Sequence, residues 1–164
     1  MPITKVVQAW MDAEGWTDDI EVSDDRLAAR VAKTYIIDGQ CHPLFFDIDE
    51  DSGAFCVVLY DFVKVAPERM VVMARILNRI NMRLRFGRLA CHDDENSNPV
   101  QFLAGIDLWE ASLPRDQIGK MLGECFSTMV QYGPLLARTA LTKQSADDLW
   151  VSFLEREAAD DAFW

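Results

Sequence analysis

The segment from Val31 to Val63 constrains the fold more than any other part of the chain. Its sequence, VAKTYIIDGQCHPLFFDIDEDSGAFCVVLYDFV, contains three runs rich in β-branched and aromatic residues, which are typical of β-strands. The dipeptide Asp38-Gly39 separates the first two runs, and the sequence DEDSG separates the second from the third. Both are turn sequences of the kind that reverse the chain. The segment therefore predicts two consecutive antiparallel hairpins.

The rest of the chain predicts helices around these hairpins. Apolar residues at helical spacing predict helices at 3–14, at 67–84, from about 114 onward, and in the final segment SADDLWVSFLERE. Two further strands are expected, near 85–92 and 100–111. Gly133-Pro134 should kink or restart the third helix, and Ser145 with Asp148 forms a capping box before the fourth. The prediction is an α+β fold with a five-stranded antiparallel sheet covered on one side. The order is helix, three strands, helix, two strands and helix, plus an extra C-terminal helix.

Length and composition favour one domain in a reducing compartment. The 164 residues, half of them apolar, suit a single domain at 1–164, with a core at about 3–141 and a helical extension at about 145–164. We expect no signal peptide and no membrane-spanning segment, and hence a cytoplasmic protein whose four cysteines remain thiols.

Charge is unevenly distributed along the chain. The net charge of −11 argues against nucleic acid and anionic membrane surfaces as partners, since both repel an acidic protein. Between Arg69 and Arg88, however, there are six arginines and no acidic residue. Such a segment is either a solvated helix face with strand ends or a basic patch that meets an acidic protein, including an acidic patch on a second copy.

Both histidines of the chain directly follow a cysteine, in Cys41-His42 and Cys91-His92. Four such residues suggest a metal site, but neighbouring side chains of a strand point to opposite faces. Only His42 and Cys91 are expected on the core side. Structural zinc needs four converging ligands, so we predict no metal and interpret the buried cysteine as a small core residue.

Other motifs predict no cofactor. DIDEDSG, at 47–53, alternates acidic residues like a calcium loop but lacks the required glycine and glutamate at the sixth and twelfth positions. Its acidic residues are interpreted as a solubilising turn. Glycine patterns that bind phosphate and the Gly-x-Ser-x-Gly motif of hydrolases do not occur. We therefore expect no catalytic residue, cofactor or small-molecule substrate.

The best candidate contact surface is the outer side of the helix at 67–84. Opposite its apolar core stripe the helix carries apolar residues mixed with arginine and asparagine, namely Val71, Val72, Arg75, Asn78, Arg79 and Met82. Protein interfaces favour Met and Arg among apolar groups, although ordinary surfaces also carry scattered apolar residues. We predict that Val71, Val72, Arg75, Arg79 and Met82 bind a protein partner.

Sequence motifs in the second half of the chain add a family resemblance. LNRINMRLRFGRL at 77–89, the strand FLAGIDLW and the later QYGPLL resemble the YbjN-domain proteins, a group labelled bacterial sensory transduction regulators. The resemblance extends from Ile3 to about Leu141, and the C-terminal extension is less typical of the family. It implies the fold of type III secretion chaperones, frequent homodimerisation, and no catalytic residues.

These observations predict a non-catalytic, chaperone-like interaction module that acts through its sheet face or the arginine-rich helix. Its expected role is regulatory, in bacterial signalling or the stress response. Two alternatives remain open. One is a secretion chaperone that binds an effector. The other, from a different class, is a small thiol- or metal-dependent enzyme that uses Cys91 or His42.

Overall fold

A computed structural model describes residues 1–24, 27–37, 39–91, 98–108 and 111–161. The two predicted hairpins are present. Strands β2 (Ala28–Ile37), β3 (Gln40–Asp49) and β4 (Ala54–Val65) follow one another and pair antiparallel. Gly39 and Gly53 lie in the two turns with φ angles of 77° and 71°, a conformation that glycine adopts at little cost. Asp38 lies outside the described residues.

The sheet has one strand more than predicted. Its order is β1-β2-β3-β4-β6-β5, and every pairing among the described residues is antiparallel. The strands β5 (Arg88–Cys91) and β6 (Asn98–Asp107) were expected, whereas the additional strand β1 (Glu21–Val22) was not. A strand of two residues is too short to produce the alternating pattern on which strand prediction depends. The segment between these two expected strands, residues 93–99, falls largely outside the described residues.

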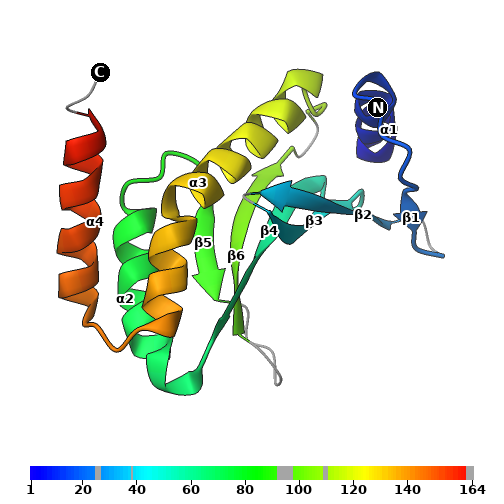
Figure 1. The fold of residues 1–164 in the computed structure, drawn as a ribbon. Coiled ribbons are helices and arrows are strands. Elements are labelled where there is room, and N and C mark those ends of the chain that lie inside the picture. The colour runs from blue at the N-terminus through cyan, green and yellow to red at the C-terminus, as the bar shows by residue number, and fades with distance from the viewer. Residues whose placement is uncertain (25–26, 38, 92–97, 109–110, 162–164) are drawn as a thin grey trace.

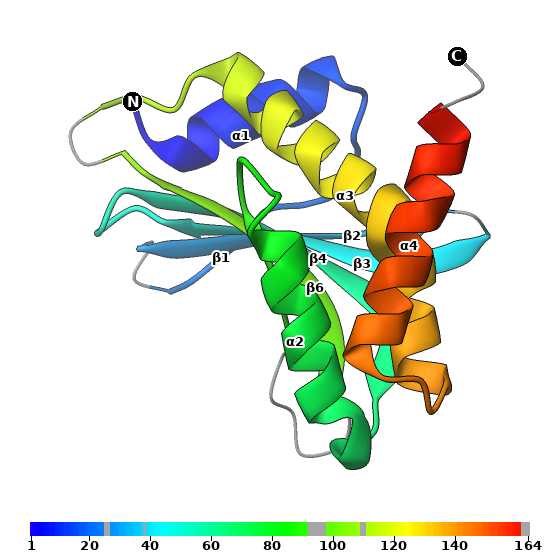
Figure 2. The same cartoon turned by 90° about the vertical axis from the view of Figure 1, so that its left-hand side faces the viewer.

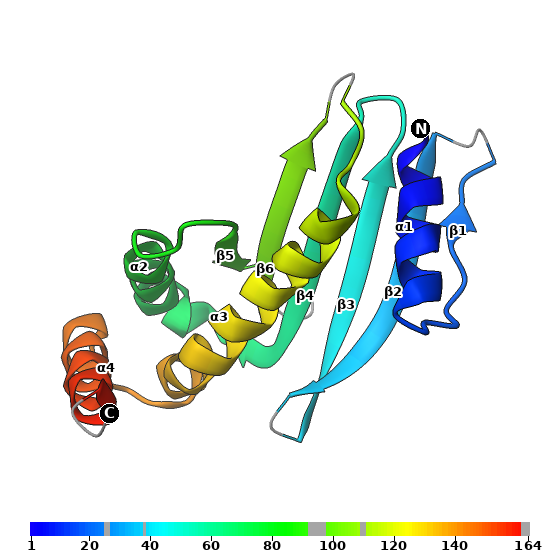
Figure 3. The same cartoon turned by 90° about the horizontal axis from the view of Figure 1, so that it is seen from above.

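The helices all lie on one side of the sheet. They are α1 (Ile3–Ala13), α2 (Met70–Asn81) after a 3₁₀ turn at Pro67–Arg69, α3 (Arg115–Leu141) and α4 (Ala146–Asp161). Figure 3 shows α3 crossing β6 and β4 while α1 lies over β2. In Figure 2, where the sheet is seen nearly edge-on, α1 and α3 lie together above it. None of the described helices lies on the opposite face of the sheet (Figure 1).

Strand alternation explains which face the helices cover. His42, Leu44, Phe46 and Ile48 of β3 are buried and point toward the helices, whereas their neighbours Cys41 and Pro43 are exposed. The predicted separation of Cys41 from His42 across the sheet is therefore confirmed. Cys91 is half-buried against the core, also as predicted, and His92 lies outside the described residues.

Helix α3 continues through Pro134 instead of restarting there. The ribbon of α3 nevertheless changes direction along its length (Figure 1), in line with the predicted kink, since proline removes one backbone hydrogen bond. The capping box before α4 is also present. Ser145 Oγ accepts a hydrogen bond from Asp148 N at 3.2 Å and donates one to Asp148 Oδ2 at 2.7 Å.

Candidate protein-interaction surfaces

The predicted contact residues of α2 divide into two groups. Val71 and Met82 expose 68% and 81% of their surface, and Arg75 is exposed beside them. Val72 instead packs against the core. Arg79 is only half-exposed because it contacts another part of the same chain. The outer strip of α2 that stays accessible is thus Val71, Arg75 and Met82.

Helix α4 lies beside α2 and supplies acidic groups to its arginines (Figure 1). Arg79 pairs with Asp147 and donates a hydrogen bond to the carbonyl oxygen of Ala146 at 3.2 Å. Arg83 Nη1 lies 2.8 Å from Glu157 Oε2. The hydrogen bond and positive charge of Arg79 hold the pKa of Asp147 below its usual value. The arginine-rich segment was expected to meet an acidic protein or a second copy. Two of its arginines, Arg79 and Arg83, instead pair with acidic residues of the same chain.

The open face of the sheet carries an apolar patch. Phe45, Val58 and Leu103 lie side by side on β3, β4 and β6, because Phe45 pairs with Val58 and Val58 pairs with Leu103. Tyr60 meets Phe45 edge to face, with ring centroids 5.7 Å apart. Val58 is only 6% exposed although no helix covers it. We call Phe45, Val58, Tyr60 and Leu103 the open-face patch.

A groove of about 410 Å³ runs along the edge of the open-face patch. It is lined by Cys41, Pro43, Phe45, Tyr60, Asp61, Lys64 and Pro99. The β4–β6 register shifts between Tyr60 and Lys64. Such irregularities redirect side chains and often mark functional positions. Apolar walls with the exposed ammonium group of Lys64 suit a polypeptide segment.

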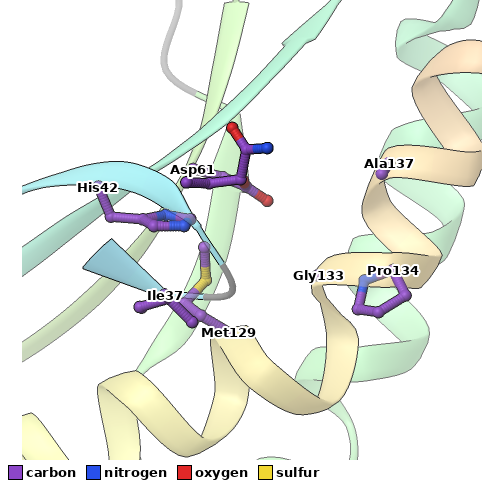
Figure 4. Close-up of a pocket in the computed structure, with 8 residues that line it drawn as sticks. Ile37, His42, Asp61, Met129, Gly133, Pro134 and Ala137 are labelled. Carbon is purple, nitrogen blue, oxygen red and sulfur yellow. The ribbon is translucent and has the colours of Figure 1, made fainter. Parts of the chain in front are cut away.

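A second cavity of about 230 Å³ lies on the helix side of the sheet, between the end of the β2–β3 hairpin and α3. His42, Asp61 and Met129 point toward one another in it (Figure 4). His42 and Asp61 are each 4% exposed. His42 Nδ1 lies 3.2 Å from the carbonyl oxygen of Tyr60, and because a carbonyl can only accept, Nδ1 carries the hydrogen.

Sequence reasoning missed Asp61, although the signal was present. Asp61 follows Leu59 at the next inward position of β4, where an apolar residue would be expected. None of the eight residues that line this cavity has a hydroxyl, thiol or amino group on its side chain. The lining thus offers no hydroxyl, thiol or amine nucleophile, and its imidazole and carboxylate belong to side chains that are almost fully buried.

The thiols and acidic groups do not assemble into a reactive centre in the described part of the chain. Burial raises the pKa of Cys56, Cys91 and Cys125, which makes each a poorer nucleophile. No three His, Cys, Asp or Glu side chains of the described residues are grouped as metal ligands would be. Of the described helices, none is long and apolar enough to cross a membrane.

Comparisons with known proteins agree on the fold. The sequence model of the YbjN family, described as "Putative bacterial sensory transduction regulator", matches residues 4–138. A search of curated proteins gives no significant match.

Three solved structures share the architecture. YbjN from E. coli has a TM-score of 0.53 at 10% identity and covers 81% of this chain and 93% of its own. A chain of the ExsC-ExsE complex has a TM-score of 0.52 at 13% identity, with 83% and 97% covered. An uncharacterized protein from Methanothermobacter thermautotrophicus has a TM-score of 0.51 at 14% identity, with 84% and 98% covered. The predicted α+β fold, like that of type III secretion chaperones, is thus confirmed. By the extent of its family match, this chain belongs to the YbjN family.

Proposed function

We propose that the protein is a non-catalytic, chaperone-like module that holds an extended polypeptide segment against the open face of its sheet, as part of bacterial regulation in the cytoplasm. The open-face patch carries this proposal. Phe45, Tyr60 and Leu103 are partly exposed on a sheet face over which none of the described helices lies, and this leaves apolar area available to a partner. The adjoining groove adds Lys64 for polar contacts.

The exposed strip of α2 is proposed as a second contact surface. Val71 and Met82 supply apolar area and Arg75 supplies charge. Arg79 and Val72 lie beneath this strip and support it, since Arg79 contacts α4 and Val72 packs against the core. A second copy of the chain or another protein would be the partner there.

A dedicated secretion chaperone is the alternative that the comparisons support. One solved structure with this fold belongs to a complex of two proteins, ExsC and ExsE. At 13% identity the likeness concerns the fold, so binding of one dedicated effector by this chain is a proposal of the same class. A dedicated chaperone would bind one effector tightly, whereas a general binding module would bind many polypeptides weakly.

Binding of a permanently unfolded polypeptide tests the proposal. Reduced, carboxymethylated α-lactalbumin with a fluorescent label is titrated with the protein and followed by anisotropy. Charges placed in the open-face patch by Phe45→Glu and Leu103→Glu should weaken binding at least about tenfold, because a buried carboxylate needs a partner that an apolar segment lacks.

Leu141→Glu provides the matched control. Leu141 is 82% exposed at the end of α3, and α3 lies on the side of the sheet opposite the open-face patch, so the same charge there should leave binding unchanged. Circular dichroism confirms that each variant is folded. Equal binding by the open-face and Leu141 variants would contradict the proposal, as would no binding by the wild-type chain.

A further inference from the structure

Helix α4 presents a regular pattern to the rest of the molecule. Ala146, Leu149 and Phe153 are buried, and Trp150 is half-buried beside them. Trp150 stacks on Phe153 with ring centroids 5.5 Å apart. Acidic residues that form ion pairs, Asp147 and Glu157, lie on either side of this aromatic pair. The pattern is an amphipathic helix with two aromatic anchors between two acidic groups.

The surface that holds α4 has the complementary chemistry. We call Arg79, Arg83, Gln131 and Tyr132 the α4 seat. Gln131 Nε2 donates to Glu157 Oε1 at 2.8 Å, and Tyr132 lies 5.3 Å from the Phe153 ring. The guanidinium of Arg83 lies 5.8 Å from the centres of both the Trp150 and Phe153 rings. Each arginine of the seat therefore contacts an acidic group and an aromatic face together.

Two observations set α4 apart from the rest of the chain. The family match ends at residue 138, so α4 lies outside the part of the chain that the family model matches. Its ion pairs are also partly open to water, with side-chain exposures of 32% for Arg79 and 75% for Asp147 in one pair, and 38% for Arg83 and 23% for Glu157 in the other. Exposed ion pairs are weak and are screened by salt, so the hold on α4 depends on a short apolar stripe.

We propose that the α4 seat is a recognition surface for acidic amphipathic helices of partner proteins, and that α4 is its resident occupant. A partner helix with an acidic residue, two aromatic residues at the third and sixth positions after it and a second acidic residue ten positions on would displace α4. This surface is separate from the open-face patch, and the proposal does not depend on the one made for that patch.

The probe is a synthetic α4 peptide, residues 145–161, carrying heavy-isotope leucine so that its fragments differ in mass from those of the protein. Hydrogen exchange of the full-length chain is measured with and without excess peptide. We expect exchange in 146–161 of the protein to accelerate at least about fivefold, while α3 keeps its protection. A peptide with Asp147→Lys and Glu157→Lys should have no effect.

Asp147→Lys and Glu157→Lys in the full-length protein should weaken the docking of α4 without changing the residues of the α4 seat. That variant should bind the fluorescent wild-type peptide at least about tenfold tighter than the wild-type protein does, because its own helix competes less. Adding Arg79→Glu and Arg83→Glu should abolish the gain. Unchanged protection of α3 confirms that each variant is folded.

The proposal is overturned if α4 keeps its protection at saturating peptide, or if the charge-reversed peptide acts equally well. Tighter binding that survives the loss of both arginines would also overturn it. So would a dimer that exchanges α4 between copies and ignores the peptide. None of these results bears on binding of unfolded polypeptide to the sheet, so each proposal can fail alone.

Discussion

At the residue scale, Glu50 shows how a distant side chain stabilises a helix end. The backbone N–H groups of Ile3 and Thr4, at the start of α1, donate to its carboxylate at 2.9 and 2.7 Å, and the hydroxyl of Thr4 donates as well. The sequence suggested only a solubilising turn here. Forty-seven positions separate Glu50 from Ile3, and no local pattern connects a hairpin turn to a helix start.

Replacing Glu50 with Gln should destabilise the protein by about 1–2 kcal/mol, the usual value of a helix N-cap. Burial raises the pKa of Glu50, but the hydrogen bonds from Thr4 and Ile3 outweigh it and the net pKa is lowered from 4.5. The stabilisation is therefore complete above about pH 4.5 and is lost as the pH falls through the lowered pKa. Urea unfolding between pH 3 and 7 measures this. Asp51→Asn, one residue away and exposed, should change stability by less than about 0.5 kcal/mol.

Gly87 is the second residue whose role is local and specific. Its φ is 71°, and a Cβ there would overlap the ring of Phe102 and lie 2.9 Å from the carbonyl oxygen of Leu103. Gly87→Ala should cost about 2–4 kcal/mol, from backbone strain and overpacking together. Gly39→Ala, at φ 77° but in open space, should cost only the strain, about 1–2 kcal/mol. Similar losses in thermal unfolding would show that the Phe102 contact is unimportant.

At the element scale, the sequence predicted what short-range patterns encode. Alternation and turn residues located β2, β3 and β4, and Ser145 with Asp148 located the start of α4. The docking of α4 on α2 was not predicted, because an exposed arginine stripe does not reveal which acidic surface meets it. The open-face patch depends on cross-strand register and on the absence of a covering helix, which are properties of the assembled sheet.

Asn81 connects two of these elements and explains one part of the family motif. Its side chain accepts a hydrogen bond from Leu89 N at 2.8 Å and donates one to the carbonyl oxygen of Leu89 at 2.9 Å. It thereby joins the end of α2 to the edge strand β5. The resemblance drawn from 77–89 thus includes a residue that holds the fold together.

Asn81→Ala should destabilise the protein by about 1–3 kcal/mol, since two partly buried hydrogen bonds are lost. Asn81→Asp keeps the acceptor but loses the donor, so we expect an intermediate loss. Asn78→Ala, three residues earlier on the exposed side of α2, is the control and should be nearly neutral. Equal stability of the Asn81 and Asn78 variants in urea would exclude the link between α2 and β5.

At the scale of the whole molecule, one layer of helices on one sheet produces graded burial of the thiols. Cys41 is exposed on the open face, Cys56 and Cys91 are half-buried, and Cys125 is buried in α3. Burial raises the pKa of the last three. A reagent added to the native protein therefore reports the layer in which each thiol lies.

Ellman's reagent at pH 8 should modify one thiol rapidly, two slowly, and Cys125 only after unfolding. Cys41→Ser should remove the rapid phase, whereas Cys125→Ala should leave it intact. Stopped-flow absorbance resolves the phases. A rapid phase that survives in the Cys41 variant would mean that another thiol is more accessible or more reactive than its burial implies.

The two outermost strands of the sheet are both short. β1 has two residues and β5 has four, and the stretch of β2 that extends beyond its pairing with β1 carries Lys33, a residue type that discourages edge pairing. Growth of the sheet by strand addition, the route by which many β-proteins capture peptides or aggregate, is therefore disfavoured at β1 and β5, and at β2 it would have to use residues 31–37 beside Lys33. A client of this protein is expected to meet side chains, so its recognition would depend on amino-acid sequence more than on β-propensity.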